Sequence, residues 1–157
     1  LSTMPIYVEH LSLLVPDVEE YKNRTSITWE EAADLPLCLL DQSMHERRII
    51  DSAFAKIGKT PDPTVTASDS ILNLIFHVVF AGFVTIVPRH FVRIPGQFPG
   101  AKALDLVDPE VTQEVGLVWP LSEPMMPMAR VMVSIAKQLK ESGELEKRLG
   151  ELSGNIT

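Results

Sequence analysis

The sequence has few of the residues that build covalent cross-links or metal sites. It contains one cysteine in 157 residues, Cys38, which excludes an internal disulfide. Because Cys38 lies within the apolar run Pro-Leu-Cys-Leu-Leu, we interpret it as a small buried side chain. The four histidines are scattered, and there is no HExxH or CxxC motif. We therefore expect neither a zinc site nor any other cofactor.

Positive charge is also scarce. The 14 Lys and Arg are outnumbered by 21 Asp and Glu, which gives a formal net charge of -7 and a pI of about 5.0. An acidic chain without a Lys/Arg-dense stretch is a poor partner for nucleic acid, so we expect no direct contact with DNA. A hydrophobic content of 45% and a charged content of 22% are instead typical of an ordinary globular domain.

Export, membrane and catalytic signals are missing too. The first residues lack a basic start followed by an apolar block, so we expect a cytoplasmic protein. The longest apolar stretch, 71–87, is interrupted by Asn73, His77, Gly82 and Thr85, which favours a buried helix and strand over a membrane span. No GxSxG, P-loop or GxGxxG motif supports a reaction class, so we do not expect an enzyme.

Alternating apolar and amphipathic segments predict a self-contained α/β unit. Thr28 and Glu31 have the spacing of a capping box, and Gly58 is suited to ending a helix. The last helix of the unit is apolar nearly all round, so its outer face should be covered. A strand expected at 6–15 precedes the unit. Within it the expected strands are 35–40, 64–67 and 83–87, the expected helices are 28–34, 44–57 and 70–81, and 17–26 is expected to be a loop.

The flanks of this unit predict part of another lobe. Two more strands are expected at 101–107 and 112–119, and a helix follows whose core stripe is Met128, Val131, Met132, Ile135 and Leu139. A chain that leaves one lobe and later returns to it builds a hinged, two-lobe architecture. The expected division is a partial first lobe at 1–15 and 101–140, a complete second lobe at 16–91, a hinge or linker at 92–100 and a charged tail at 141–157. We interpret the sparse flanks and the start at Leu1 as signs of a longer protein.

Several ordered segments carry a family resemblance. They are PIYVEHLSLLVP, ITWEEAADLPLCLL, MHERRIIDSAFAKIGKTPDPTV, SDSILNLIFHVVFAGFVTIVPRH and the closing SEPMMPMARVMVSIAKQL. In this order they resemble the effector-binding domain of LysR-type transcriptional regulators, from Met4 to Lys140. One departure is Val84, which stands where the family usually has a second glycine after the one matched by Gly82.

The resemblance implies an α/β fold of the two-lobe, type 2 periplasmic-binding-protein-like kind, with the second lobe complete and the first partial. It implies a small-molecule effector in the cleft between lobes, with domains that pair as dimers and full-length proteins that form tetramers. DNA would be bound only through a winged helix-turn-helix domain, which lies N-terminal to this domain in such regulators and is not in this sequence. A solute-binding protein of a transport system, which has the same fold, is the alternative.

Two loop-to-helix junctions are the predicted effector site. Helix N-termini offer unpaired N–H groups and the positive end of the helix dipole, which favour an anion or an oxygen acceptor. The alternative is that their serines and aspartates only cap their own helices. We expect both junctions to face one cleft. Their residues are Leu40, Asp41, Gln42, Ser43, Met44 and His45 in the first, and Ser68, Asp69 and Ser70 in the second.

Arg47 is the charged candidate at the first junction. It falls in the first turn of its helix, where a guanidinium could hold a carboxylate with two hydrogen bonds. The alternative is an ion pair with Glu46, Asp51 or Asp41 on a solvated face. Asp41 acts against an anionic effector, because its own negative charge would repel one.

Overall fold

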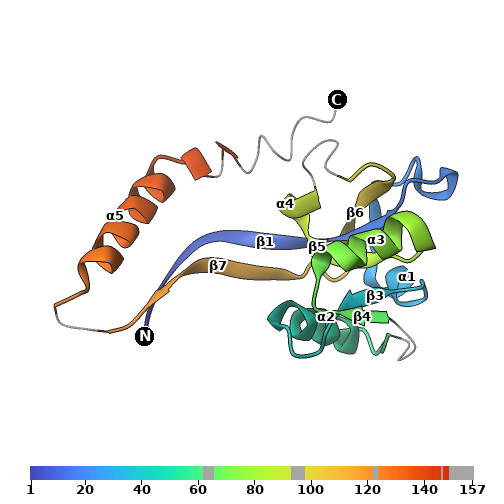
Figure 1. Ribbon diagram of the computed structural model, residues 1–157, viewed down its shortest axis with the longest axis horizontal. Helices are drawn as coiled ribbons and strands as arrows, with labels where there is room; N and C mark the ends of the chain where they lie inside the picture. Colours follow the sequence, from blue (N-terminus) through green and yellow to red (C-terminus); the bar gives the residue numbers. More distant parts are fainter. Residues whose placement is uncertain (62–65, 93–97, 122–123, 146, 149–157) are drawn as a thin grey trace. The chain divides into compact units, whose positions relative to one another are not determined.

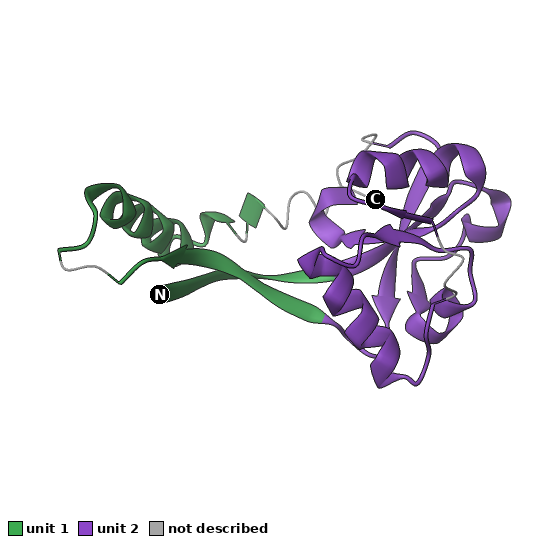
Figure 2. Cartoon of the chain, turned by 60° about the horizontal axis from the view of Figure 1, so that its bottom comes forward, with its two compact units in different colours: residues 1–10, 112–157 green, residues 11–111 purple. Residues whose placement is uncertain are grey.

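The computed structural model describes residues 1–61, 66–92, 98–121, 124–145 and 147–148. The chain divides into two compact units, one of Leu11–Val111 and one of Leu1–His10 with Thr112–Thr157 (Figure 2). The larger unit is wider than the predicted lobe at 16–91, because strand residues on both sides of that range pair within its sheet. The division into lobes stays a prediction, and 93–97 of the expected hinge lie outside the described residues.

The larger unit is built on a sheet with strand β1 at its centre (Figure 1). The second half of β1 pairs antiparallel with β5 on one side and with β6 on the other, and β2 adds to β6 in parallel. A parallel pair, β3 and β4, is joined to β5 through a bridge between Leu37 and Val84. These strands are β1 (Ser2–Pro16), β2 (Ser26–Thr28), β3 (Cys38–Leu40), β4 (Thr66–Ser68), β5 (Thr85–Pro88) and β6 (Ala101–Val107).

The helices of this unit confirm those that the sequence periodicity predicts. They are η1 (Glu19–Tyr21), α1 (Trp29–Ala33), α2 (His45–Lys56), α3 (Ile71–Ala81) and α4 (Arg89–Val92). The capping box is present, since the Thr28 side chain accepts from the Glu31 N–H while the Glu31 carboxylate accepts from the Thr28 N–H. Gly58 and Gly82 adopt the left-handed conformation just after α2 and α3, with φ of 71° and 73°.

Two local predictions need correction, and a third falls partly outside the described residues. The expected loop at 17–26 includes η1 and the first residue of β2, a three-residue strand too short to leave a periodic signal. The expected strand at 35–40 is regular only from Cys38, because Leu37 turns back onto Leu35 through a hydrogen bond of 2.8 Å. The strand expected at 64–67 is confirmed at Thr66 and Ala67, in β4, while 64–65 lie outside the described residues.

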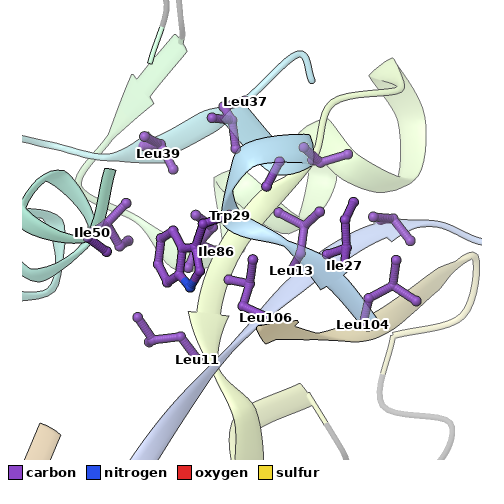
Figure 3. Close-up of a cluster of buried hydrophobic side chains, with 14 of the residues drawn as sticks. Leu11, Leu13, Ile27, Trp29, Leu37, Leu39, Ile50, Ile86, Leu104 and Leu106 are labelled. Carbon is purple, nitrogen blue, oxygen red and sulfur yellow. The ribbon is translucent and has the colours of Figure 1, made fainter. Parts of the chain in front are cut away.

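Alternate residues of the central strands fill two separate cores, one on each face of the sheet. On the face of α1 and α2, Trp29 meets Phe54 edge-on, with ring centroids 5.2 Å apart. Figure 3 shows Trp29 among the other buried side chains of this core. On the face of α3, the core consists of Leu14, Cys38, Leu40, Leu74, Ile75, Val78 and Val87. Neighbours such as Leu13 and Leu14 therefore point to opposite faces, as strand geometry requires.

The smaller unit is a two-stranded ribbon with one helix. The first half of β1 pairs antiparallel with β7 (Thr112–Trp119), from Ser2 opposite Trp119 to His10 opposite Thr112. Gly116 faces a bulge in β1, and a Cβ atom there would overlap the carbonyl oxygen of Met4. Helix α5 (Pro127–Glu141) completes the unit.

The predicted core stripe of α5 is wrong for the described residues. Val133 and Ala136 are the buried residues of this helix. The side chains expected in the core are instead 40–73% exposed, namely Met128, Val131, Met132, Ile135 and Leu139. The helical periodicity did identify an apolar face of α5, but the side chains of that face are exposed. Among the residues that the structure describes, none of the helices has the length and apolar character needed to cross a bilayer.

We expect the Trp29–Phe54 contact to dominate the stability of the larger unit. Phe54 is fully buried, so Phe54→Ala should lower the free energy of unfolding by about 3–5 kcal/mol in urea titrations. Phe80→Ala is the matched control, because it removes the same ring from another helix at a position 77% exposed. It should cost less than about 1 kcal/mol. Equal losses for the two variants would contradict this core assignment.

Candidate functional site

The two predicted junctions lie side by side at one edge of the sheet. Strands β3 and β4 run parallel in a register that pairs Leu40 with Ser68, the last residue of each strand. The Asp41 N–H then donates to the Ser68 carbonyl oxygen at 3.0 Å. The carboxyl ends of neighbouring parallel strands are where α/β folds place their ligands. The two loops therefore lie side by side, while the shared cleft and ligand binding there stay predictions.

The first junction is a tight turn organised by Asp41. Its carboxylate accepts from the Ser43 N–H at 2.9 Å, and its carbonyl oxygen accepts from the Met44 N–H at 3.0 Å. The hydrogen bond from the Ser43 backbone is the main cause that holds the pKa of Asp41 below its usual value. Gln42 and Ser43 are exposed, while Met44 packs against the core on the α3 side. The turn thus presents a fixed negative charge to solvent.

The N-terminus of α2 is not capped by a side chain. Met44 occupies the cap position and has no oxygen to offer, and Ser43 lies one residue too early. Within the described part of the chain, no acceptor is found for the N–H groups of His45, Glu46 and Arg47. The capping alternative therefore fails for Ser43, and the first turn of α2 keeps donors available for a ligand or for water.

The second junction is largely satisfied by its own residues. Ser70 caps α3 by accepting from the Asn73 N–H at 3.5 Å. The Ser68 hydroxyl oxygen accepts from the Ser70 N–H at 3.1 Å and from the Asn73 side-chain amide at 3.4 Å. Asp69 is exposed beside them. Ser70 therefore does cap its own helix.

Asn73 is a residue of this junction that the sequence analysis missed. Its side-chain amide reaches Ser68, and its backbone carbonyl oxygen lies 2.6 Å from a ring nitrogen of His77. The signal was its position three residues after the cap Ser70, where a polar side chain can fold back over the start of the helix. Asn73 therefore holds the Ser68 hydroxyl in place.

Arg47 ties α2 to the end of β3. Its Nε donates to the Asp51 carboxylate and its Nη1 donates to the Leu40 carbonyl oxygen, both at 2.8 Å. The side chain is only 12% exposed, against 43% for Asp51. The expected ion pair with Asp51 is present, whereas the bond to Leu40 was not foreseen. Leu40 contributes its carbonyl oxygen here, while its side chain is buried in the core on the α3 side.

The single thiol lies behind the site and is not reactive. Burial raises the pKa of Cys38 to about 11, so the side chain is a neutral thiol at physiological pH. Its sulfur lies 3.7 Å from the Leu74 carbonyl oxygen. In the described ranges, no three His, Cys, Asp or Glu side chains come together as metal ligands would. The described residues of the two junctions offer backbone N–H groups and hydroxyls as hydrogen-bonding groups.

Comparison with known proteins relates the chain to regulators. A family model described as the LysR substrate binding domain matches residues 1–140. A curated protein, the HTH-type transcriptional regulator SsuR of Burkholderia cenocepacia, is 37% identical over 68 residues, which cover 43% of this chain. That match spans only 22% of the length of SsuR.

Solved structures show the same fold at low sequence identity. The effector-binding domain of QuiR in complex with shikimate superimposes with a TM-score of 0.74 at 18% identity, covering 90% of this chain and 66% of that one. An OxyR mutant of Corynebacterium glutamicum gives a TM-score of 0.73 at 20% identity, covering 99% and 48%. Full-length CbnR in complex with its target DNA gives 0.71 at 17%, covering 87% and 45%. These likenesses confirm the predicted α/β architecture.

We expect Arg47 to act first as a structural clamp. Arg47→Ala should lower the free energy of unfolding by about 1.5–3 kcal/mol, because two hydrogen bonds from a charged and largely buried group are lost. Arg48→Ala is the matched control, since the neighbouring Arg48 is exposed, and it should change stability by less than about 0.5 kcal/mol. Chemical denaturation of both variants measures the difference, and equal effects would leave Arg47 without this role.

Proposed function

The chain belongs to the LysR substrate-binding domain family, and on that premise we propose that it is the effector-binding domain of a transcription regulator. The single observation that supports a ligand site is the shared edge of β3 and β4, where the uncapped start of α2 meets the ordered hydroxyls of Ser68 and Ser70. Three free backbone donors suit a small molecule rich in oxygen acceptors. Shikimate, the ligand named with the QuiR domain, is such a molecule.

The proposed contacts follow from the geometry of the two loops. The N–H groups of His45, Glu46 and Arg47 would donate to ligand oxygens, and the Ser68 and Ser70 hydroxyls would complete the set. Leu40, Asp41, Gln42, Ser43, Met44 and Asp69 would line the same edge, and Arg47 would hold its shape through Leu40. In the division we propose, residues 16–91 are the second lobe and 1–15 with 101–140 belong to the first.

The regulatory mechanism we propose is allosteric. An effector shifts a regulator only if it binds one of its conformations more tightly than another. The match spans about a fifth of the length of SsuR, an HTH-type transcriptional regulator. By analogy with that class of regulator, we propose that DNA is bound by a separate N-terminal domain. We further propose a cytoplasmic homo-oligomer, with domains in pairs and a tetramer for the full-length protein.

The transport alternative shares the fold, but both the family match and the curated relative favour a regulator.

Proline at the first position of α2 provides a sharp test of the donor site. His45→Pro removes one N–H that has no acceptor in the described chain, and Met44 already has the extended conformation that precedes proline, with φ of -76° and ψ of 142°. His45→Ala is the matched control, because it removes the side chain but keeps the N–H. Isothermal titration with shikimate and a panel of small hydroxy acids should show about 5- to 20-fold weaker binding for the proline variant only.

Two results of this titration would count against the site. Binding that is unchanged in His45→Pro would place the ligand away from the start of α2. Equal weakening in His45→Ala would assign the effect to the imidazole instead of the backbone. Thermal unfolding of both variants without ligand should give the same midpoint within about 2 °C, because proline is well tolerated at this helix position.

The charge of Asp41 should select against anionic ligands. Its pKa is held below the ordinary value of 3.8, so the carboxylate is ionised at every pH above that value. Asp41→Asn keeps the turn-forming side chain and removes the charge, so affinity for a carboxylate ligand should rise about 2- to 5-fold, since one charge near a surface contributes on the order of 1 kcal/mol. Titration of wild type and variant at low salt measures this. A neutral ligand is the control, and a similar gain for it would contradict the electrostatic explanation.

A further inference from the structure

Methionine is concentrated at the start of α5. Four of the six methionines in the chain fall between residues 125 and 132. Three of them are well exposed, with exposed fractions of 53% for Met126, 73% for Met128 and 49% for Met132. Met44 instead packs against the core on the α3 side, and Met4 is half-buried. The most accessible thioethers of the chain are thus Met126, Met128 and Met132, which we call the methionine cluster.

No packing or capping role accounts for methionine at these positions. Met128 and Met132 lie four residues apart in α5, so their side chains are neighbours on one face of the helix. The side chains of α5 that are buried are those of Val133 and Ala136. Met126 occupies the cap position, where Ser, Thr, Asp or Asn would accept a hydrogen bond, and its side chain makes no cap bond in the described chain. The exposed sulfur atoms are therefore available for chemistry of their own.

The thioether is the sulfur group of this chain that an oxidant in solution can reach. Cys38 is fully buried, and burial raises the pKa of its thiol to about 11, so it offers no thiolate to a peroxide. A thioether carries no proton on sulfur, so its lone pairs stay nucleophilic at physiological pH. Susceptibility to oxidation then follows solvent exposure. Exposure therefore directs a two-electron oxidant to the methionine cluster.

We propose that Met126, Met128 and Met132 form a reversible oxidation site whose oxidant is a hydroperoxide such as hydrogen peroxide. A lone pair of the sulfur attacks one peroxide oxygen, the O–O bond breaks, and that oxygen stays on sulfur as a sulfoxide. The proton of the transferred oxygen moves to the other oxygen, which leaves as water, so the sulfur is oxidised by two electrons and the peroxide is reduced. A dithiol enzyme of the methionine sulfoxide reductase class reverses the step. Its two thiols become a disulfide, and the sulfoxide oxygen leaves as water.

Oxidation of the methionine cluster converts part of an apolar surface into a polar one. A sulfoxide is a polar, chiral group whose oxygen accepts hydrogen bonds, and it replaces a flexible apolar side chain. Sulfoxides at Met128 and Met132 interrupt the exposed apolar face of α5, which also includes Val131, Ile135 and Leu139. Because the oxidised side chains are exposed, the fold stays intact. The site changes surface polarity, and it does not depend on effector binding at the β3–β4 edge.

Peptide mapping by mass spectrometry tests the oxidation site. After limited exposure of the chain to hydrogen peroxide, sulfoxide should form at Met126, Met128 and Met132 roughly tenfold faster than at Met44, which lies against the core. Methionine sulfoxide reductases A and B should together restore all three thioethers, because each enzyme reduces one sulfoxide epimer. An equal rate at Met44, or sulfoxides that both reductases leave in place, would overturn the proposal.

Variants of the cluster test the change in surface polarity. The oxidised chain should elute earlier than the reduced chain in hydrophobic-interaction chromatography, with unchanged circular dichroism, and reductase treatment should reverse the shift. Combined Met126→Leu, Met128→Leu and Met132→Leu substitutions keep apolar side chains of similar volume, so peroxide should no longer shift the elution. Met44→Leu is the matched control and should keep the full shift. An oxidised chain that elutes unchanged, or a shift that persists in the triple leucine variant, would contradict the proposed role of these residues.

Discussion

Strand β3 is the constraint on which the candidate site depends. Its three residues are buried, with Cys38 and Leu40 in the core beside α3 and Leu39 in the core beside α1 and α2. One edge of β3 pairs with β4, and the chain just before it is joined to β5 through the Leu37–Val84 bridge. Because both faces and both edges are occupied, the strand cannot shift by a residue without turning its side chains into the wrong cores. The position of the loop that follows is fixed by this packing.

The loop after β3 combines two electrostatic influences of opposite sign. The uncapped N–H groups at the start of α2 favour negative charge, while the ionised Asp41 carboxylate disfavors it. One carboxylate oxygen of Asp41 accepts a hydrogen bond from the Ser43 N–H, so the negative charge of the side chain is held at the turn. Backbone donors beside a fixed carboxylate favour hydroxyl and carbonyl oxygens, which need donors and little net charge. Selectivity at this edge would then come from the number and direction of hydrogen bonds.

Sequence reasoning succeeded where a local pattern determines the structure. The capping box at Thr28 and Glu31, the amphipathic α2 and Gly58 just after it each depend on residues within one or two turns. The bond from Arg47 to the Leu40 carbonyl oxygen could not be read in this way, because it depends on the turn geometry between β3 and α2. The same holds for β2, whose three residues form a strand only because β6 lies beside them. The adjacency of the two loops followed from the parallel strand order, which the alternation of strands and helices does predict.

Helical periodicity cannot tell a core from an interface, and α3 and α5 show why. Burial in a core and burial against another protein select the same apolar side chains at the same spacing. In α5 the stripe expected in the core is exposed, and in α3 an exposed stripe lies opposite a buried one. What distinguishes an interface is the absence of charge around the exposed apolar residues, since ordinary solvent-facing helices carry charged side chains there. Helix α3 has none over its whole length, whereas α5 carries Arg130, Lys137 and Lys140.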